Sequence, residues 1–313
     1  MAVNESTRAF LEQAQAMGVK PFHQYSPAEC KALFSQLSAS FGNGPQVWQV
    51  REESVTSGDS AVRLRLFLPD GRARGILLYC HGGGWVMGSA DDYDAFVRRL
   101  VVSTGWAVGL VDYRLAPEHP FPAPLEDCWS ALLWLAEHAP QLLGPNLDLV
   151  VAGDSAGGNL AAVLARRARD LGAPRIAAQI LAYPVVQAEK TYPSQSDPDC
   201  QLLLSQNDMD WFWDLYDPRR DGRTSPDGAP LLAADLRGLP PALVFTAGYD
   251  PLRDEGIDYA ERLEAAGVPV FHCNYAEDMH GFVTLPPLAS SVDALRDVRD
   301  FLSKIGRPAP REG

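Results

Sequence analysis

Hydrophobic residues follow two alternating patterns along most of this chain. Short apolar runs, typical of buried strands, alternate with longer segments in which apolar residues recur every three or four positions, as in amphipathic helices. The alternation predicts an α/β protein with a mostly parallel central sheet and helices on both faces. The predicted strands are residues 62–68, 75–80, 106–111, 147–152, 176–183, 243–246 and 268–275. The helices predicted between and after them are 125–138, 159–170, 258–266 and 291–305.

Two segments depart from this alternation. Residues 1–45 carry two helical patterns and no strand signal, which predicts an N-terminal helical segment. Residues 187–230 are rich in proline, serine and aspartate, and a polar segment that also clusters aromatic rings predicts an inserted lid. The clustered rings are those of Trp211, Phe212, Trp213 and Tyr216. Residues 46–186 and 231–306 then form the expected core, and residues 307–313 a flexible tail.

The composition narrows the possible functions. The 313 residues include 27 basic and 40 acidic side chains, and the net charge of −13 argues against nucleic acid or an anionic membrane surface as partner. The five cysteines contain no CxxC pair and no HExxH motif is present, so we expect neither a disulfide framework nor a metal site. The first helical pattern is charged and no apolar run reaches 18 residues, which predicts a cytoplasmic protein without a membrane span.

The strongest chemical signal is a G-x-S-x-G motif centred on Ser155, between a predicted strand and a predicted helix. At such a turn the serine hydroxyl projects above the sheet, and Gly153 and Gly157 are needed because a Cβ at either position would meet neighbouring backbone. The N-terminus of the following helix favours a developing oxyanion. A tight structural turn with an incidental serine is the competing interpretation.

A second motif, HGGGW at residues 81–85, follows another predicted strand. Three glycines let the backbone approach a ligand, and such a loop beside a G-x-S-x-G turn forms the oxyanion hole of lipases and esterases. A flexible loop or a phosphate cradle are the alternatives, but the sequence matches neither phosphate-binding glycine motif. We expect His81 itself to be structural, because the loop needs backbone donors.

An acid and a base are expected downstream of the serine, in that order. Asp250 directly follows the strand 243–246, whereas Asp254 is better placed to cap the next helix or to pair with Arg253. Of the two downstream histidines, His272 lies within a predicted strand and His280 lies just beyond it, in a loop suited to a general base. Ligands in open α/β sheets bind at the carboxyl ends of strands, which favours Asp250 and His280.

Five motifs in this order resemble one family. They are HGGGW (81–85), DYRLAPE (112–118), GDSAGGNLA (153–161), YDPLRD (249–254) and MHGF (279–282). Together they resemble the bacterial hormone-sensitive-lipase-like carboxylesterases of the α/β-hydrolase fold, in which N-terminal helices like residues 1–45 form part of a helical cap. The resemblance implies a catalytic triad of Ser155, Asp250 and His280. It implies an oxyanion hole made by the backbone N–H groups of Gly83, Gly84 and Ala156.

The resemblance also implies hydrolysis of a small-molecule ester with a short to medium acyl chain, without metal or cofactor. A homodimer is a further expectation from the family. The aromatic residues expected to contact substrate are Trp85, Trp211 and Trp213; the alternative for the rings of the lid is that they only pack the lid against the N-terminal helices. An aryl amidase or formamidase on the same fold is the first alternative. A non-catalytic receptor, as in the plant gibberellin receptors, is the second, although those proteins lack the catalytic histidine that His280 supplies here.

Overall fold

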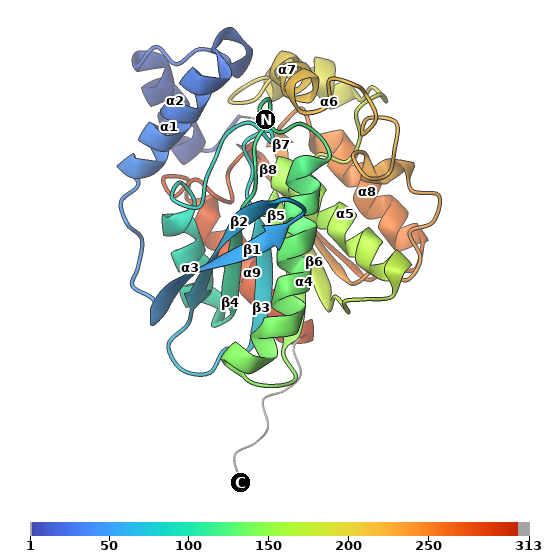
Figure 1. Cartoon of the computed structure of the whole chain (residues 1–313). Helices are drawn as coiled ribbons and strands as arrows, with labels where there is room; N and C mark the ends of the chain where they lie inside the picture. Colours follow the sequence, from blue (N-terminus) through green and yellow to red (C-terminus); the bar gives the residue numbers. More distant parts are fainter. Residues whose placement is uncertain (1, 306–313) are drawn as a thin grey trace.

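The computed structural model describes residues 2–305, so the predicted tail at 307–313 lies outside the described residues. Its centre is one eight-stranded sheet in the order β1-β2-β4-β3-β5-β6-β7-β8 (Figure 1). Six neighbouring strands are parallel to one another: β4, β3, β5, β6, β7 and β8. Strand β2 runs antiparallel to both of its neighbours, β1 and β4. The mostly parallel sheet predicted from the sequence is therefore confirmed.

The elements have the following bounds. The strands are β1 (Gln49–Ser57), β2 (Ser60–Leu68), β3 (Gly75–Cys80), β4 (Ala107–Asp112), β5 (Asp148–Asp154), β6 (Ala178–Ala182), β7 (Ala242–Tyr249) and β8 (Val270–Met279). The α-helices are α1 (Glu5–Ala16), α2 (Pro27–Ser40), α3 (Asp94–Thr104), α4 (Ala123–Leu143), α5 (Ala156–Leu171), α6 (Pro193–Ser196), α7 (Gln206–Tyr216), α8 (Arg253–Ala265) and α9 (Ser290–Ile305). Short 3₁₀ helices are η1 (Phe22–Gln24), η2 (Pro198–Cys200) and η3 (Pro230–Leu232).

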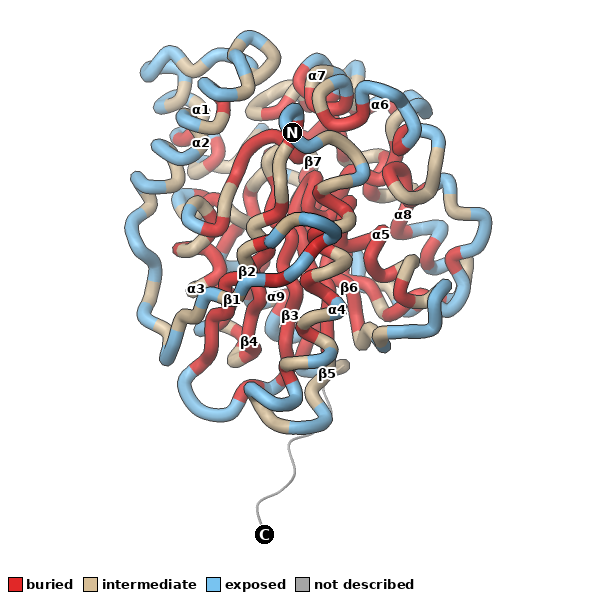
Figure 2. The backbone as a smooth tube through the Cα atoms, viewed as in Figure 1, coloured by how far each residue is buried: buried red, intermediate tan, exposed pale blue. Residues whose placement is uncertain are grey.

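The sheet separates two hydrophobic cores, because successive side chains of a strand point to opposite faces. In β3, Ile76 and Leu78 join the core beneath α4, α5 and α8, whereas Leu77 and Tyr79 join the core beneath α3 and α9. Figure 2 shows the result as a buried centre, with exposed residues in the outer helices, the loops and the edge strand β1. Both faces are covered, which explains why the central strands are apolar throughout.

A strand and a helix of the core, β1 and α3, lie outside the ranges predicted for strands and helices. Strand β1 is long and polar because it lies at the edge of the sheet, where only its last residues, including Val55, are buried. Helix α3 is rich in β-branched residues, which have low helix propensity. It forms where its buried face, with Phe96, Val97 and Leu100, packs in the core shared with α9. Tertiary packing, and not local helix propensity, therefore makes this segment helical.

A layer of helices lies over the carboxyl ends of the parallel strands. Figure 1 shows α1 and α2 beside α6 and α7, which belong to the segment predicted as a lid. The two parts are joined, since His23 Nδ1 lies 2.7 Å from Asp208 Oδ1 and the rings of Phe22 and Phe212 are 5.8 Å apart. The start of the chain is also attached to the core, because Asn4 donates a backbone hydrogen bond to Glu277.

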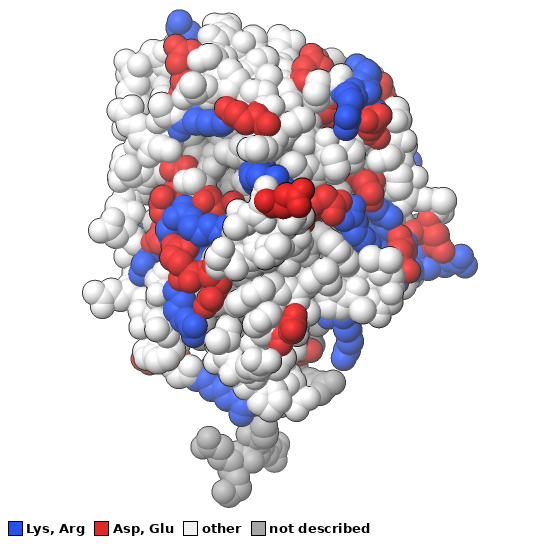
Figure 3. Space-filling model, viewed as in Figure 1, with Lys and Arg blue, Asp and Glu red and all other residues white. Residues whose placement is uncertain are grey.

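Among residues 2–305, no helix is long and apolar enough to cross a membrane. On the face shown in Figure 3, acidic and basic side chains are interspersed and do not form a single-sign patch.

Candidate active site

Ser155 occupies a sharp turn between β5 and α5. Its φ of 55° and ψ of −120° are strained for a residue with a Cβ, and its N–H donates to Ala182 O at 2.8 Å. The turn leaves no space at its glycines: a Cβ on Gly153 would lie 2.2 Å from Gly157 O, and one on Gly157 would lie 2.0 Å from Cys80 O. The steric requirement inferred from the motif is therefore present in the structure.

Three polar side chains from separate elements meet at this turn. Ser155 Oγ lies 3.0 Å from His280 Nε2, and His280 Nδ1 lies 2.8 Å from Asp250 Oδ2. Asp250 is fully buried at the end of β7, and only 9% of His280 is exposed. An ionised carboxylate can only accept hydrogen bonds, so Nδ1 carries the proton and Nε2 is free to accept from the serine hydroxyl. This arrangement can move a proton away from Ser155.

The competing residues lie elsewhere. Asp254 accepts hydrogen bonds from the backbone N–H of Ser194 at 2.8 Å and from Arg253 Nε at 2.7 Å, so it ties the lid segment to α8. His272 lies in β8 with Nε2 2.8 Å from Thr246 Oγ1, and burial lowers the pKa of this histidine. Neither of these two residues contacts Ser155 or His280 among the hydrogen bonds of the described chain.

Residues 81–85, here called the glycine loop, lie beside the serine. Gly83 and Gly84 have φ values of 102° and 61°, a left-handed conformation that glycine adopts without strain. Both line the same cavity as Ser155 and His280, and Ala156 is the first residue of α5. In residues 2–305, no hydrogen bond from the N–H groups of Gly83, Gly84 or Ala156 to another protein group is found, so these donors can serve a substrate oxygen.

His81, the first residue of the glycine loop, packs against the buried side of the loop. It is fully buried, its Nδ1 lies 2.8 Å from Gly82 O, and its ring stacks on Tyr113 with centroids 4.1 Å apart. Burial lowers the pKa of His81, which favours the neutral ring. Tyr113 in turn donates to His81 O at 2.6 Å, so the DYRLAPE segment braces the loop.

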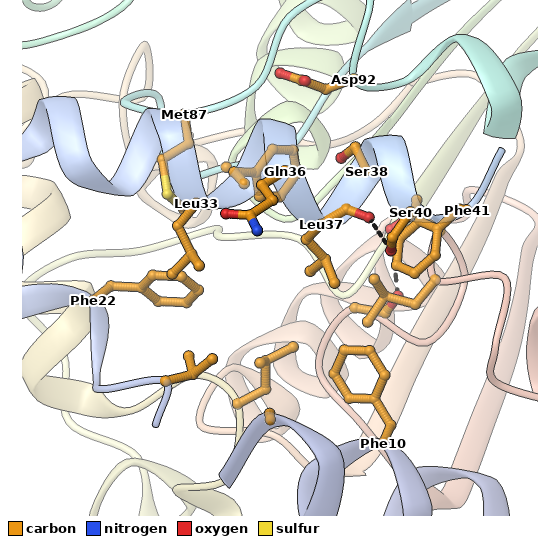
Figure 4. A pocket seen from close by; sticks show the side chains of 18 of the residues that line it. Phe10, Phe22, Leu33, Gln36, Leu37, Ser38, Ser40, Phe41, Met87 and Asp92 are labelled. Carbon is orange, nitrogen blue, oxygen red and sulfur yellow. Dashed lines mark hydrogen bonds between the residues drawn. The ribbon is translucent and has the colours of Figure 1, made fainter. Parts of the chain in front are cut away.

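A cavity of about 610 Å³ opens above Ser155, between the sheet and the N-terminal helices. Figure 4 shows Phe10, Leu33 and Leu37 of α1 and α2 pointing into it, with Phe22 and Met87 on its wall. The described residues that line this cavity include Asp92 and Asp154 but no lysine or arginine. The space therefore suits an apolar ligand without negative charge.

None of the three tryptophans expected to contact substrate lines this cavity; Phe212 does. Trp85 is fully buried and stacks on Tyr216 with centroids 4.2 Å apart, and Trp213 packs against Trp85 at 4.7 Å. Trp211 is partly buried and packs on Phe212. Periodicity could not have singled out Phe212, because positions 212, 213 and 216 all belong to the buried face of α7.

No group of three or more His, Cys, Asp or Glu side chains in residues 2–305 is arranged to hold a metal ion.

Comparison with known proteins identifies a family and several similar ester hydrolases. Residues 77–284 match the family model for the α/β hydrolase fold. The "Esterase LipI" of Mycobacterium tuberculosis is 45% identical over 216 residues, 69% of this chain and 68% of that protein. The "Ethyl acetate hydrolase" of Pseudomonas putida is 34% identical over 306 residues, 94% of this chain and 96% of that protein. The structure of a hyperthermophilic esterase from the archaeon Pyrobaculum calidifontis superposes with a TM-score of 0.91 and 36% identity, covering 97% of this chain and 99% of that one.

Proposed function

Because this chain belongs to the hormone-sensitive-lipase-like family of the α/β hydrolase fold, we propose that it is a carboxylesterase that forms an acyl-enzyme on Ser155. One observation carries the proposal: the chain of contacts from Ser155 Oγ through His280 to the buried carboxylate of Asp250. Such a chain activates a hydroxyl that is otherwise a weak nucleophile at neutral pH.

His280 Nε2 takes the hydroxyl proton as Ser155 Oγ attacks the ester carbonyl carbon. The same nitrogen then protonates the departing alkoxide, and the acyl group stays on the serine. Water, deprotonated by His280, attacks the acyl-enzyme, and the acid leaves as serine regains its proton. Asp250 holds the imidazole tautomer and stabilises the imidazolium without becoming protonated.

The oxygen of each tetrahedral intermediate carries the negative charge. Backbone N–H groups of Gly83, Gly84 and Ala156 are the donors that we assign to it; the first two belong to the left-handed turn of the glycine loop and the third to the N-terminus of α5. Stabilisation of the developing charge by such donors is usually the largest single contribution to catalysis. The loss of one donor lowers kcat about 10²–10³-fold in serine hydrolases.

The substrate that we assign is a neutral ester with a short to medium acyl chain. A cavity of about 610 Å³ with an apolar wall supports this assignment. Its lining in the described chain contains carboxylates and no cation, so a substrate with its own carboxylate would meet repulsion and find no ion-pair partner.

A series of p-nitrophenyl esters from acetate to palmitate, assayed with wild type and Ser155→Ala, tests the function. We expect turnover that peaks at short to medium chains, covalent labelling of wild type by a fluorophosphonate, and loss of both in the variant. The variant retains only the catalysis by the remaining donors, about 10³–10⁴-fold over water. A variant with more than a few per cent of wild-type kcat would remove Ser155 as nucleophile.

A further inference from the structure

A second buried carboxylate lies next to the nucleophile. Asp154 is the last residue of β5 and only 3% exposed. Its Oδ1 accepts hydrogen bonds from Tyr79 Oη at 2.9 Å and from the backbone N–H of Gly82 at 3.0 Å. Its Oδ2 accepts from Tyr93 Oη at 2.9 Å. Asp154 therefore joins the nucleophile strand to the first glycine of the glycine loop.

The contact with Gly82 is too close for any other residue at that position. A Cβ on Gly82 would lie 2.4 Å from Asp154 Oδ2 and 3.0 Å from Asp154 O. Immediately afterwards the loop turns, since the N–H groups of Val86 and Met87 both donate to Gly83 O at 3.1 and 2.8 Å. With Gly82 fixed on one side and this turn on the other, Gly83 and Gly84 have little freedom to move.

Asp154 has no cationic partner to account for its burial. No ion pair joins it to a lysine or arginine within the described chain, and its three donors are neutral. Desolvation raises the pKa of Asp154 to about 6, while hydrogen bonds from Tyr79, Tyr93 and Gly82 act in the opposite direction. A buried carboxylate with no cationic partner lowers the free energy of unfolding, because burial of an ionised group is unfavourable unless its interactions compensate. An apolar side chain would fill the same space without this cost.

We propose that Asp154 is a positioning residue, whose carboxylate holds the glycine loop where the N–H groups of Gly83 and Gly84 meet the oxyanion of the tetrahedral intermediate. The inference rests on the proposed function, because it concerns the same reaction. It adds a residue that makes no hydrogen bond to the side chains of Ser155, His280 or Asp250. Asp154 reaches the loop through Gly82, directly and through Tyr93 Oη, which accepts from the same Gly82 N–H at 3.1 Å. A displacement of about 1 Å in such a donor set costs on the order of 10²-fold in rate.

The test compares Asp154→Ala with Asp154→Asn. The asparagine retains an oxygen for Gly82 and Tyr79, and its amide can donate to Tyr93 Oη. Rates are expressed per active site, counted by fluorophosphonate titration, so that loss of folded protein does not enter kcat. Gln179→Leu is the control for loss of a buried polar contact: Gln179 is also fully buried, but it lies near the start of β6, donates to Pro240 O at 3.0 Å and does not touch the glycine loop.

The second readout is the inhibition constant of an alkyl trifluoromethyl ketone. Ser155 Oγ bonds to its carbonyl carbon, the serine proton passes to His280, and the carbonyl oxygen becomes an oxyanion in the position to be tested. We expect Asp154→Ala to lose about 10²-fold in kcat and a similar factor in ketone affinity with KM nearly unchanged, and Asp154→Asn to recover most of both. The control should lose thermal stability and keep its kcat per active site.

Equal kcat and ketone affinity in Asp154→Ala and the control would overturn the inference and leave the proposed function intact. Failure of the wild type to react with the fluorophosphonate would instead overturn the proposed function. Should Asp154→Ala not fold, Gly82→Ala tests the same contact from the loop side, since its methyl group would displace Oδ2. Wild-type kcat per site in Gly82→Ala would then count against the inference.

Discussion

The ring of Phe212 lies directly on the backbone of Gly84, so that a Cβ added to Gly84 would come within 2.3 Å of Phe212 Cδ1. This ring belongs to the lid segment, and Gly84 belongs to the glycine loop. Phe212 also lines the cavity and packs on Phe22 of the N-terminal segment. One side chain of the lid therefore contacts both the glycine loop and the N-terminal segment and also lines the cavity.

Replacement of Phe212 by alanine should enlarge the cavity beside Ser155 and favour longer acyl chains. A contact of one or a few methylenes changes selectivity by about 1–3 kcal/mol, so we expect the ratio of kcat/KM for octanoate over butyrate to rise about tenfold or more. Trp213→Ala is the control, because Trp213 is equally buried but does not line the cavity. It should lower the melting temperature and leave the ratio flat. A flat ratio in both variants would mean that the ring only fastens the lid.

The two acids near α8 should differ strongly when each is changed to its amide. Asp250→Asn can hold His280 in the wrong tautomer, and we expect kcat to fall by up to about 10⁴-fold. Asp254→Asn weakens contacts with Ser194 of the lid segment and with Arg253 of α8, neither of which touches Ser155 or His280, so we expect kcat to change on the order of fivefold or less. Steady-state kinetics at fixed pH measures both. The opposite ranking would show that Asp254 is the acid of the site.

Buried Glu255 should make the protein less stable as the pH rises. Desolvation raises its pKa to about 8 from 4.5, with Asp250 adding in the same direction, although the N–H of Val186 donates to its Oε1 at 2.8 Å. Between pH 4.5 and 8 the folded state therefore holds a proton that the unfolded state releases, and the free energy of unfolding decreases through this window. Glu255→Gln removes this dependence and should gain stability relative to wild type as the pH rises.

Denaturant unfolding of both proteins at intervals from pH 5 to 8.5 measures the difference in slope. Glu137→Gln provides the control, because Glu137 is exposed on α4. Parallel curves for wild type and Glu255→Gln would contradict the prediction.

The glycines of the serine turn should tolerate no methyl group. In Gly157→Ala the new Cβ would meet Cys80 O at 2.0 Å and His81 O at 2.5 Å, which are backbone atoms at the end of β3 and the start of the glycine loop. We expect a loss of at least about 3 kcal/mol in the free energy of unfolding, together with lower kcat per active site. Gly172→Ala meets nothing within 4 Å and carries only the cost of its φ of +72°, about 1–2 kcal/mol, with kcat per site unchanged.

Much of the site could be inferred from the chain alone, because local motifs place its parts at strand ends. The G-x-S-x-G turn, the glycine loop and the segments around Asp250 and His280 each follow a parallel strand, and parallel strands bring such ends to one edge of the sheet. The choice of His280 over His272 followed from the same reasoning, since one lies within β8 and the other just beyond it.

Other features depended on contacts between distant segments. Helix α3 forms against α9 despite its β-branched residues, and β1 pairs as an edge strand despite its polar sequence. The aromatic residue of α7 that lines the cavity is Phe212 and not one of its tryptophan neighbours, because the packing of α7 against Trp85 and Gly84 sets which ring faces inward.

The sequence by itself determined the alternation of strands and helices, the strained serine turn and the order of nucleophile, acid and base. These follow from periodicity and from local steric limits on the backbone, which act over a few residues. Only the tertiary structure decided that Asp154 meets Gly82, 72 positions away, and which apolar side chains enclose the cavity. Contacts of that kind depend on the register between neighbouring strands and on how the helices pack above them, which the pattern of a single segment does not specify.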